Sequence, residues 1–344
     1  MEYKIKDFDV RKIVNNDLKL YHEFFMQLLA EARPEDLPRP FEKFKKQITN
    51  IALDSEVKRW VIYQKDKIVS YAMLMIYLEG ENSHIVDADI FTLPEYRKRG
   101  MAKQLLKILY KYCRDNDLTV MEFSTFSTTP YGSRFLEKIG AKLGKKEFVY
   151  QLDLSKVKED LLEKWINMAK ERATEYRLEL WENETSREKL ADYVALYNDF
   201  VNSEPMGDLD YEEEDFDVEH IRDEMSVNKK RGWKDWLLLA RHIPTGILAG
   251  FTEVVYTGFD KELMLQFGTG VLKEHRNKGL GRWLKAEMIS IIKDKMPDVK
   301  RIRSHNATIN KPMTRINEQL GFIVQYFEEY WHIDTKKVGE YVNN

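Results

Sequence analysis

The chain has 344 residues, and at roughly 150 residues per domain this length predicts two domains. Hydrophobic residues make up 43% of it, enough for two cores, and the formal net charge of −3 argues against a protein that binds a polyanion over its whole surface. No apolar run reaches the roughly 18 residues that span a bilayer, and the N-terminus lacks the apolar core of a signal peptide. We therefore expect a cytoplasmic protein that binds neither nucleic acid nor membrane. The single cysteine, Cys113, lies among apolar residues at helical spacing and is expected to be a buried structural thiol.

In chain order, the hydrophobic periodicity of the first half predicts a mixture of strands and helices. The expected strands are 4–8, 58–63, 68–76, 84–92, 118–123 and 148–154, and the expected helices are 16–32, 41–52, 100–113 and 132–138. The polar turn 64–67 joins two of these strands as a hairpin. A further helix is expected at 155–173, where apolar side chains again recur at helical spacing.

The second half repeats this order of elements. Its pattern predicts strands 176–181, 236–241, 247–256, 263–272, 300–304 and 322–327, and helices 188–202, 218–230, 279–293 and 309–319. Equivalent residues keep a constant offset, since Arg276 follows Arg97 by 179 positions and Gly279 follows Gly100 by the same number. This offset indicates two copies of one α/β unit. The expected domains are 1–154 and 174–344, joined by a packed linker helix at 155–173.

Each copy carries a basic, glycine-containing turn between a strand and a long helix, at 91–102 and 270–281. Backbone N–H groups at a helix start attract an anion, and a glycine lets a phosphate approach the backbone closely. An ordinary solvated turn is the alternative, but two such turns at equal offsets favour an anion site. The candidate residues are Arg97, Lys98, Arg99, Gly100, Met101 and Ala102 in the first copy, and Arg276, Asn277, Lys278, Gly279, Leu280, Gly281 and Arg282 in the second.

These turns resemble the Q/R-x-x-G-x-G/A motif of the GNAT acyltransferase superfamily, and the resemblance extends over nearly all of both halves. It implies an α/β (α+β) fold class with two tandem GNAT folds, each a splayed mixed sheet flanked by helices, arranged as in mycothiol synthases. It also implies that each turn holds the pyrophosphate of acetyl-CoA (coenzyme A). The pantetheine arm would pair with backbone at Phe91 and Thr92, or at Val271 and Leu272. Asn306 and Asn310 match a late cofactor-binding segment of the family, with helix capping as the alternative.

Amide formation from a thioester needs a base for the ammonium group and an acid for the departing thiolate. In much of the GNAT superfamily the acid is a tyrosine, and the matching positions here are Leu136 and Asn317. Glu253 lies in an otherwise apolar strand of the second copy, so we expect a raised pKa and a role as the base, with an outward-facing solvated strand residue as the alternative. Tyr326 and Asn317 are the other catalytic candidates. Tyr330 and His305, and Tyr131 in the first copy, are further alternatives, and each of these side chains could instead be structural.

Seven acidic residues lie within 207–217, in the loop that borders the acceptor pocket in the GNAT family. This run could attract a cationic amine, although a solvated loop is the alternative. The expected function is the transfer of an acetyl group to a primary amine of a small molecule, with the C-terminal domain as the catalytic one. No metal is expected, and the chain is expected to be a monomer, as an internal pseudo-dimer, or a homodimer. Because the usual tyrosine is missing, a non-catalytic acyl-CoA-binding sensor or regulatory protein is the alternative function.

Overall fold

The computed structural model describes residues 3–344, which form two compact units. Unit 1 comprises the chain up to Lys146 together with Met206–Glu212 and Tyr326–Asn344. Unit 2 comprises Glu147–Pro205 and Glu213–Gln325. Each unit is therefore assembled from both halves of the sequence. In the part of the chain that the structure describes, no helix is long and apolar enough to cross a membrane.

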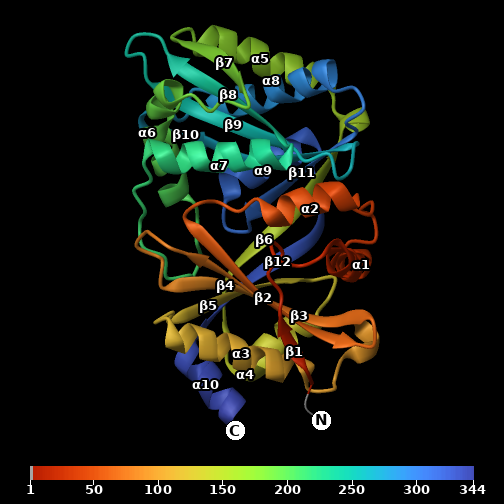
Figure 1. The fold of residues 1–344 in the computed structure, drawn as a ribbon. Helices are drawn as coiled ribbons and strands as arrows, with labels where there is room; N and C mark the ends of the chain where they lie inside the picture. Colours follow the sequence, from red (N-terminus) through yellow and green to blue (C-terminus); the bar gives the residue numbers. More distant parts are fainter. Residues whose placement is uncertain (1–2) are drawn as a thin grey trace. The chain divides into compact units, whose positions relative to one another are not determined.

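Unit 1 is a mixed sheet with helices on both faces (Figure 1). Its strands lie in the order β1, β2, β3, β4, β5, β12, and β4 and β5 are parallel while the other neighbours are antiparallel. Helices α1 and α2 pack on one face, and α3, α4 and α10 pack on the other. The bounds are β1 Ile5–Asp7, α1 Asn15–Ala32, α2 Phe41–Thr49, β2 Ser55–Gln64, β3 Lys67–Tyr77, β4 Ile85–Thr92, α3 Met101–Asp115, β5 Val120–Phe126, α4 Tyr131–Ile139, β12 Ile323–Asp334 and α10 Thr335–Asn343.

The end of the chain completes the core of unit 1. Strand β12 pairs with β5 from Glu328 opposite Phe126 to Asp334 opposite Val120. Trp331 is buried in the same apolar core as the buried side chains of α3, and its indole N–H donates to Thr125 Oγ1 at 3.0 Å. Figure 1 shows α10, from the blue end of the sequence, beside the yellow-orange α3. The C-terminal residues are thus part of the unit that the N-terminal residues begin.

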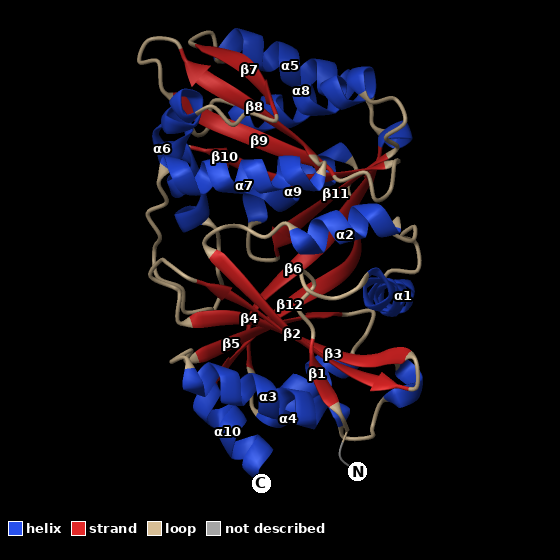
Figure 2. Ribbon diagram, viewed as in Figure 1, coloured by secondary structure: helices blue, strands red, loops and turns tan. Residues whose placement is uncertain are grey.

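Unit 2 repeats this plan with a strand from the first half of the sequence. Its strands lie in the order β6, β11, β10, β9, β8, β7, with β10 and β11 parallel and the other neighbours antiparallel. Figure 2 shows α5 and α8 side by side on one face, and α6 and α7 pack on the other. The bounds are β6 Lys142–Asp153, α5 Glu159–Arg172, β7 Tyr176–Glu182, α6 Arg187–Ser203, α7 Val218–Arg231, β8 Lys234–His242, β9 Leu248–Tyr256, β10 Leu263–Val271, α8 Leu280–Lys295, β11 Arg301–Ala307 and α9 Lys311–Leu320.

The expected fold class and element order are confirmed, including a packed helix, α5, in the linker. The expected splay is also present. Strands β4 and β5 pair only over Ile85–Asp87, and β10 and β11 pair only over Leu263–Gln266, so each pair separates toward its basic turn. Cys113 is fully buried, as expected. The compact units differ from the boundaries expected at 154 and 173, because each copy's last strand pairs within the other unit.

Candidate functional site

The two basic turns have the same backbone conformation. Gly100 and Gly279 are the N-caps of α3 and α8, with φ and ψ of 83° and −1° in one and 87° and 1° in the other. Lys98 and Asn277 also have positive φ, at 60° and 65°. A side chain is strained in this left-handed region, so a glycine suits each N-cap. Apart from the adjoining backbone and chain neighbours, no heavy atom lies within 4 Å of where a Cβ would stand at either glycine, which leaves room for a bound group beside the helix start.

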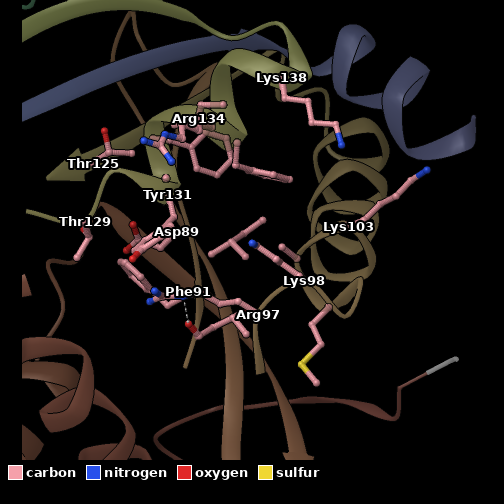
Figure 3. A pocket seen from close by; sticks show the side chains of 18 of the residues that line it. Asp89, Phe91, Arg97, Lys98, Lys103, Thr125, Thr129, Tyr131, Arg134 and Lys138 are labelled. Carbon is pink, nitrogen blue, oxygen red and sulfur yellow. Dashed lines mark hydrogen bonds between the residues drawn. The ribbon is translucent and has the colours of Figure 1, made fainter. Parts of the chain in front are cut away.

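A cavity of about 690 Å³ lies in unit 1 where β4 and β5 separate. Its walls come from the last residues of β4, the basic turn, the first turn of α3, the end of β5, α4 and α10. Figure 3 shows Lys98, Lys103 and Lys138 on one side of the cavity and Asp89 and Phe91 on the other. The helix start and these lysines make one side of the cavity suited to phosphate groups, while the strands offer an apolar slot.

The expected cofactor residues of the first copy line this cavity, but Arg97 has a different role from the one expected. Its Nε donates to the Thr92 carbonyl at 3.0 Å, and its two Nη atoms donate to the Glu31 carboxylate at 2.6 and 2.5 Å. Arg97 therefore connects the turn to the end of β4 and to α1 through hydrogen bonds. Lys98 and Arg99 are exposed at the cavity, where Phe91, Thr92, Gly100, Met101 and Ala102 also lie.

Asp89 places a carboxyl group in the wall of the same cavity. Burial, followed by the nearby carboxylates of Asp87 and Glu328, raises its pKa to about 7. A carboxyl group with this pKa can accept a proton at neutral pH and release it again. Sequence reasoning missed Asp89, although an acidic residue in an otherwise apolar strand was the signal that selected Glu253.

A tyrosine also reaches the cavity. Tyr131 begins α4, lines the cavity, and has its ring 4.7 Å from the Arg97 guanidinium carbon. The sequence suggested Tyr131 only as an alternative acid for the first copy. Leu136, at the position of the family's usual acid, lines the same cavity and offers no proton. Tyr131 is therefore the tyrosine that the structure brings into the cavity from α4.

The acidic loop contributes to unit 1 as well as to unit 2. Met206–Glu212 belongs to unit 1, where the Tyr211 hydroxyl donates to Glu122 Oε2 at 3.0 Å. His332 Nε2 lies 2.7 Å from the same oxygen. In unit 2, Asp217 caps α7 by accepting from the backbone of Glu219 and His220. The acidic run is therefore divided between the two units, and its attraction of a cationic amine stays a prediction.

The catalytic candidates of the second copy are divided between the two units. Tyr326 is only 4% exposed and belongs to unit 1, where its ring centroid is 6.0 Å from that of Phe126. Assigning Tyr326 to the second copy was wrong, because β12 crosses into unit 1. Asn317 is fully buried in unit 2, and its Oδ1 accepts from Lys285 Nζ at 2.7 Å. Glu253 is half-buried, and burial raises its pKa to about 8, as expected in direction.

In unit 2, several expected cofactor residues have partners inside the unit. Arg276 Nε donates to the Val271 carbonyl at 2.8 Å, and Lys278 Nζ donates to the Tyr176 hydroxyl at 2.9 Å. Asn310 caps α9 by accepting from the Met313 N–H, which is the capping alternative, and Asn306 Nδ2 donates to Thr314 Oγ1 at 3.0 Å. The remaining positions of this turn, Leu272, Asn277, Gly279, Leu280, Gly281 and Arg282, lie at the end of β10 and the start of α8.

Comparison with known proteins agrees with the fold. The family model for the acetyltransferase (GNAT) family matches residues 20–141, which lie within unit 1 and contribute most of the cavity wall. These residues form a GNAT acetyltransferase domain. None of the curated proteins matches the sequence. The GNAT domain therefore includes the first basic turn, Asp89 and Tyr131.

Solved structures extend the likeness to the whole chain. A tandem GNAT protein from the clavulanic acid biosynthesis pathway has a TM-score of 0.78 at 20% identity, over 97% of this chain and 99% of its own. A GCN5-related N-acetyltransferase from Sphaerobacter thermophilus has a TM-score of 0.69 at 13% identity, over 96% of each chain. At these identities the likeness establishes the fold, so the chain has a tandem GNAT fold. The particular likeness to mycothiol synthases stays a prediction.

Proposed function

We propose that the chain is an acetyl-CoA-dependent N-acetyltransferase that acts on a small amine, with its reaction site in unit 1. The observation that carries this proposal is the 690 Å³ cavity, which joins a glycine-capped helix start to the Asp89 carboxyl group. The GNAT domain at residues 20–141 supports acyl transfer, and the open space beside Gly100 fits a phosphate. The sequence favoured the second copy, but this cavity and the family match both lie in unit 1.

The residues around the cavity divide into a binding part and a chemical part. The first backbone N–H groups of α3, with Lys98 and Lys103, would hold the phosphates, and the backbone of Phe91 and Thr92 would face the pantetheine arm. The cofactor supplies an acetyl thioester when bound. Asp89 would accept the proton of the acceptor ammonium group, which frees the nitrogen lone pair for attack. Tyr131 offers a hydroxyl proton for the departing sulfur.

An assay of free thiol release tests the proposal. Purified protein is incubated with acetyl-CoA and a panel of primary amines and amino acids, and the rate is compared with hydrolysis in the absence of an acceptor. We expect at least one acceptor to raise the rate and to yield the acetylated product by mass spectrometry. If acetyl-CoA binds by calorimetry but no acceptor raises the rate, the sensor alternative replaces the enzyme.

A further inference from the structure

A second, smaller cavity of about 210 Å³ opens beside the first in unit 1. Its wall is formed by α1, the segment after α1, and Phe44 of α2. Four lining residues are shared with the larger cavity, namely Phe91, Arg97, Phe126 and Thr129. A compound in the smaller cavity would therefore lie next to the larger one. The volume is below that of a site for a drug-sized ligand, which is typically about 300 Å³ or more, so it suits a small metabolite.

The charge of the smaller cavity is carried mainly by arginines. Three arginines and one glutamate line it, among aromatic and aliphatic side chains. Glu31 is already paired with Arg97 through two hydrogen bonds. Arg39 Nη1 donates to Gln47 Oε1 at 3.2 Å. Glu31 balances the charge of Arg97, and Arg39 has a hydrogen-bond partner on α2. Arg33 is the third arginine of this wall.

Arg33 is held by aromatic rings. Its guanidinium carbon lies 4.8 Å from the ring centroid of Phe126 and 5.6 Å from that of Tyr326. Over residues 3–344, no carboxylate forms an ion pair with the Arg33 side chain. Ring contacts use the face of a guanidinium group and leave its N–H donors at the edge. A half-buried guanidinium group with such donors matches the two oxygens of a carboxylate.

We propose that the smaller cavity binds the acceptor and that Arg33 recognises a carboxylate on it. The acceptor class is then an amine that also carries a carboxylate, as in an amino acid. This inference rests on the proposed acetyl transfer and names its substrate class. Tyr326, which reaches unit 1 on the exchanged strand β12, acts as a positioning residue because its ring lies beside the Arg33 guanidinium. The carboxylate of such an acceptor would lie beside Arg33, and its ammonium group would face the carboxyl groups around Asp89.

Matched pairs of acceptors that differ by one carboxylate test the inference. The pairs are phenylalanine with phenethylamine, lysine with cadaverine, and glutamate with 4-aminobutyrate. For at least one pair we expect kcat/KM of the wild type to favour the more carboxylated member on the order of ten- to hundredfold, as for a hydrogen bond to a charged group. In Arg33→Gln this preference should fall to about twofold or less, while the KM for acetyl-CoA stays unchanged. Arg33→Lys should keep part of the preference, because lysine keeps the positive charge but lacks the paired N–H donors of a guanidinium group.

The control is Arg114→Gln, an exposed arginine paired with Asp115 on α3, which should leave the preference unchanged. Binding of the same pairs is also measured by thermal shift and calorimetry, which needs no turnover. If acetyl transfer fails but the carboxylated members bind and lose affinity in Arg33→Gln, the inference about the cavity stands and the proposed function fails. Equal binding within every pair, no binding of any pair, or an equal loss for both members in Arg33→Gln overturns the inference.

Discussion

Asp89 is the residue on which the proposed chemistry depends most. Its pKa of about 7 has burial as its main cause, with the carboxylates of Asp87 and Glu328 as further causes. Only the deprotonated form can act as a base, so kcat/KM should rise with pH and level off above about pH 7. Asp89→Asn should lower kcat by about a hundredfold or more and remove this rise. Steady-state kinetics between pH 5.5 and 8.5 measure both effects.

The same substitution should stabilise the folded protein although it lowers activity. A carboxyl group whose pKa is raised from 3.8 to about 7 by folding destabilises the folded state increasingly as pH rises between these two values, because the unfolded chain has released a proton that the folded chain still holds, and the destabilisation is largest above about pH 7. Asp89→Asn should therefore raise the melting temperature more at pH 8 than at pH 5. The exposed Asp66→Asn in the hairpin turn serves as the control for both measurements. An Asp89→Asn variant that keeps the pH dependence of kcat/KM would exclude Asp89 from the mechanism.

Lys285 is a second buried ionisable residue, in unit 2. It is 1% exposed, and burial lowers its pKa to about 7. Between this value and the ordinary value of 10.5, the unfolded chain holds a proton that the folded chain releases. Stability should therefore rise with pH in this range, by up to about 1.4 kcal/mol per pH unit from this group. Lys285→Met should make the free energy of unfolding less dependent on pH between 7 and 9.

Urea denaturation at pH 7, 8 and 9 measures this dependence. The control is Lys107→Met, which removes an exposed lysine from α3. If both variants show the same dependence on pH as the wild type, Lys285 is charged in the folded protein. Such a result would mean that the hydrogen bond to Asn317 Oδ1 is strong enough to keep the charge in the core.

At the scale of elements, the basic turn shows what local sequence can and cannot predict. A strand, a glycine and a helix in succession predicted the turn, because the positive φ of Gly100 and the helix start depend on neighbouring residues. The role of Arg97 was not predictable in this way. Its carboxylate partner, Glu31, lies on α1, 66 positions away in the sequence. A motif therefore located the site but did not say which of its cations contact a ligand.

Substitutions at Gly100 and Gly279 can show which of the two turns binds acetyl-CoA. Gly100→Asp places a carboxylate where the phosphates would bind, so acetyl-CoA binding in unit 1 should be lost in calorimetry. Gly100→Asn has nearly the same shape and tolerates positive φ, so it should weaken binding far less. The corresponding pair at Gly279 should leave the affinity of unit 1 unchanged. Comparable loss in Gly100→Asn and Gly100→Asp would mean that backbone strain, not charge, accounts for the effect.

At the scale of the whole molecule, the exchange of last strands was hidden from the sequence. Strands β6 and β12 end equivalent copies, and each pairs with a strand of the other copy. Periodicity predicts that a strand exists but not which sheet it joins. The expected domain boundary at 154 followed from reading each copy as continuous. Tyr326 and the acidic loop were placed in the second copy for the same reason.

The exchange predicts how the chain responds to truncation. A chain that ends at residue 154 lacks β12 and α10, so β5 keeps β4 but loses its other neighbour, and the core around Leu106 loses Trp331, Ile333 and Val338. Burying a large side chain contributes about 1.5–3 kcal/mol, and a whole domain is stable by only about 5–15 kcal/mol. We therefore expect no cooperative unfolding transition for this fragment by circular dichroism. A second chain, with residues up to Lys146 joined through a flexible linker to Tyr326–Asn344, should regain the transition.

This rejoined chain also tests where the cofactor binds. All residues that line the 690 Å³ cavity lie before Lys146 or, for Tyr341, in the restored C-terminal segment. If unit 1 holds the site, the rejoined chain should bind acetyl-CoA with the affinity of the full chain, and Gly100→Asp should abolish that binding. If the rejoined chain folds but binds no acetyl-CoA, the cofactor site would instead lie in unit 2, where the second turn has the same conformation. Folding of the fragment that ends at residue 154, without its partner strand, would instead show that β5 does not need β12.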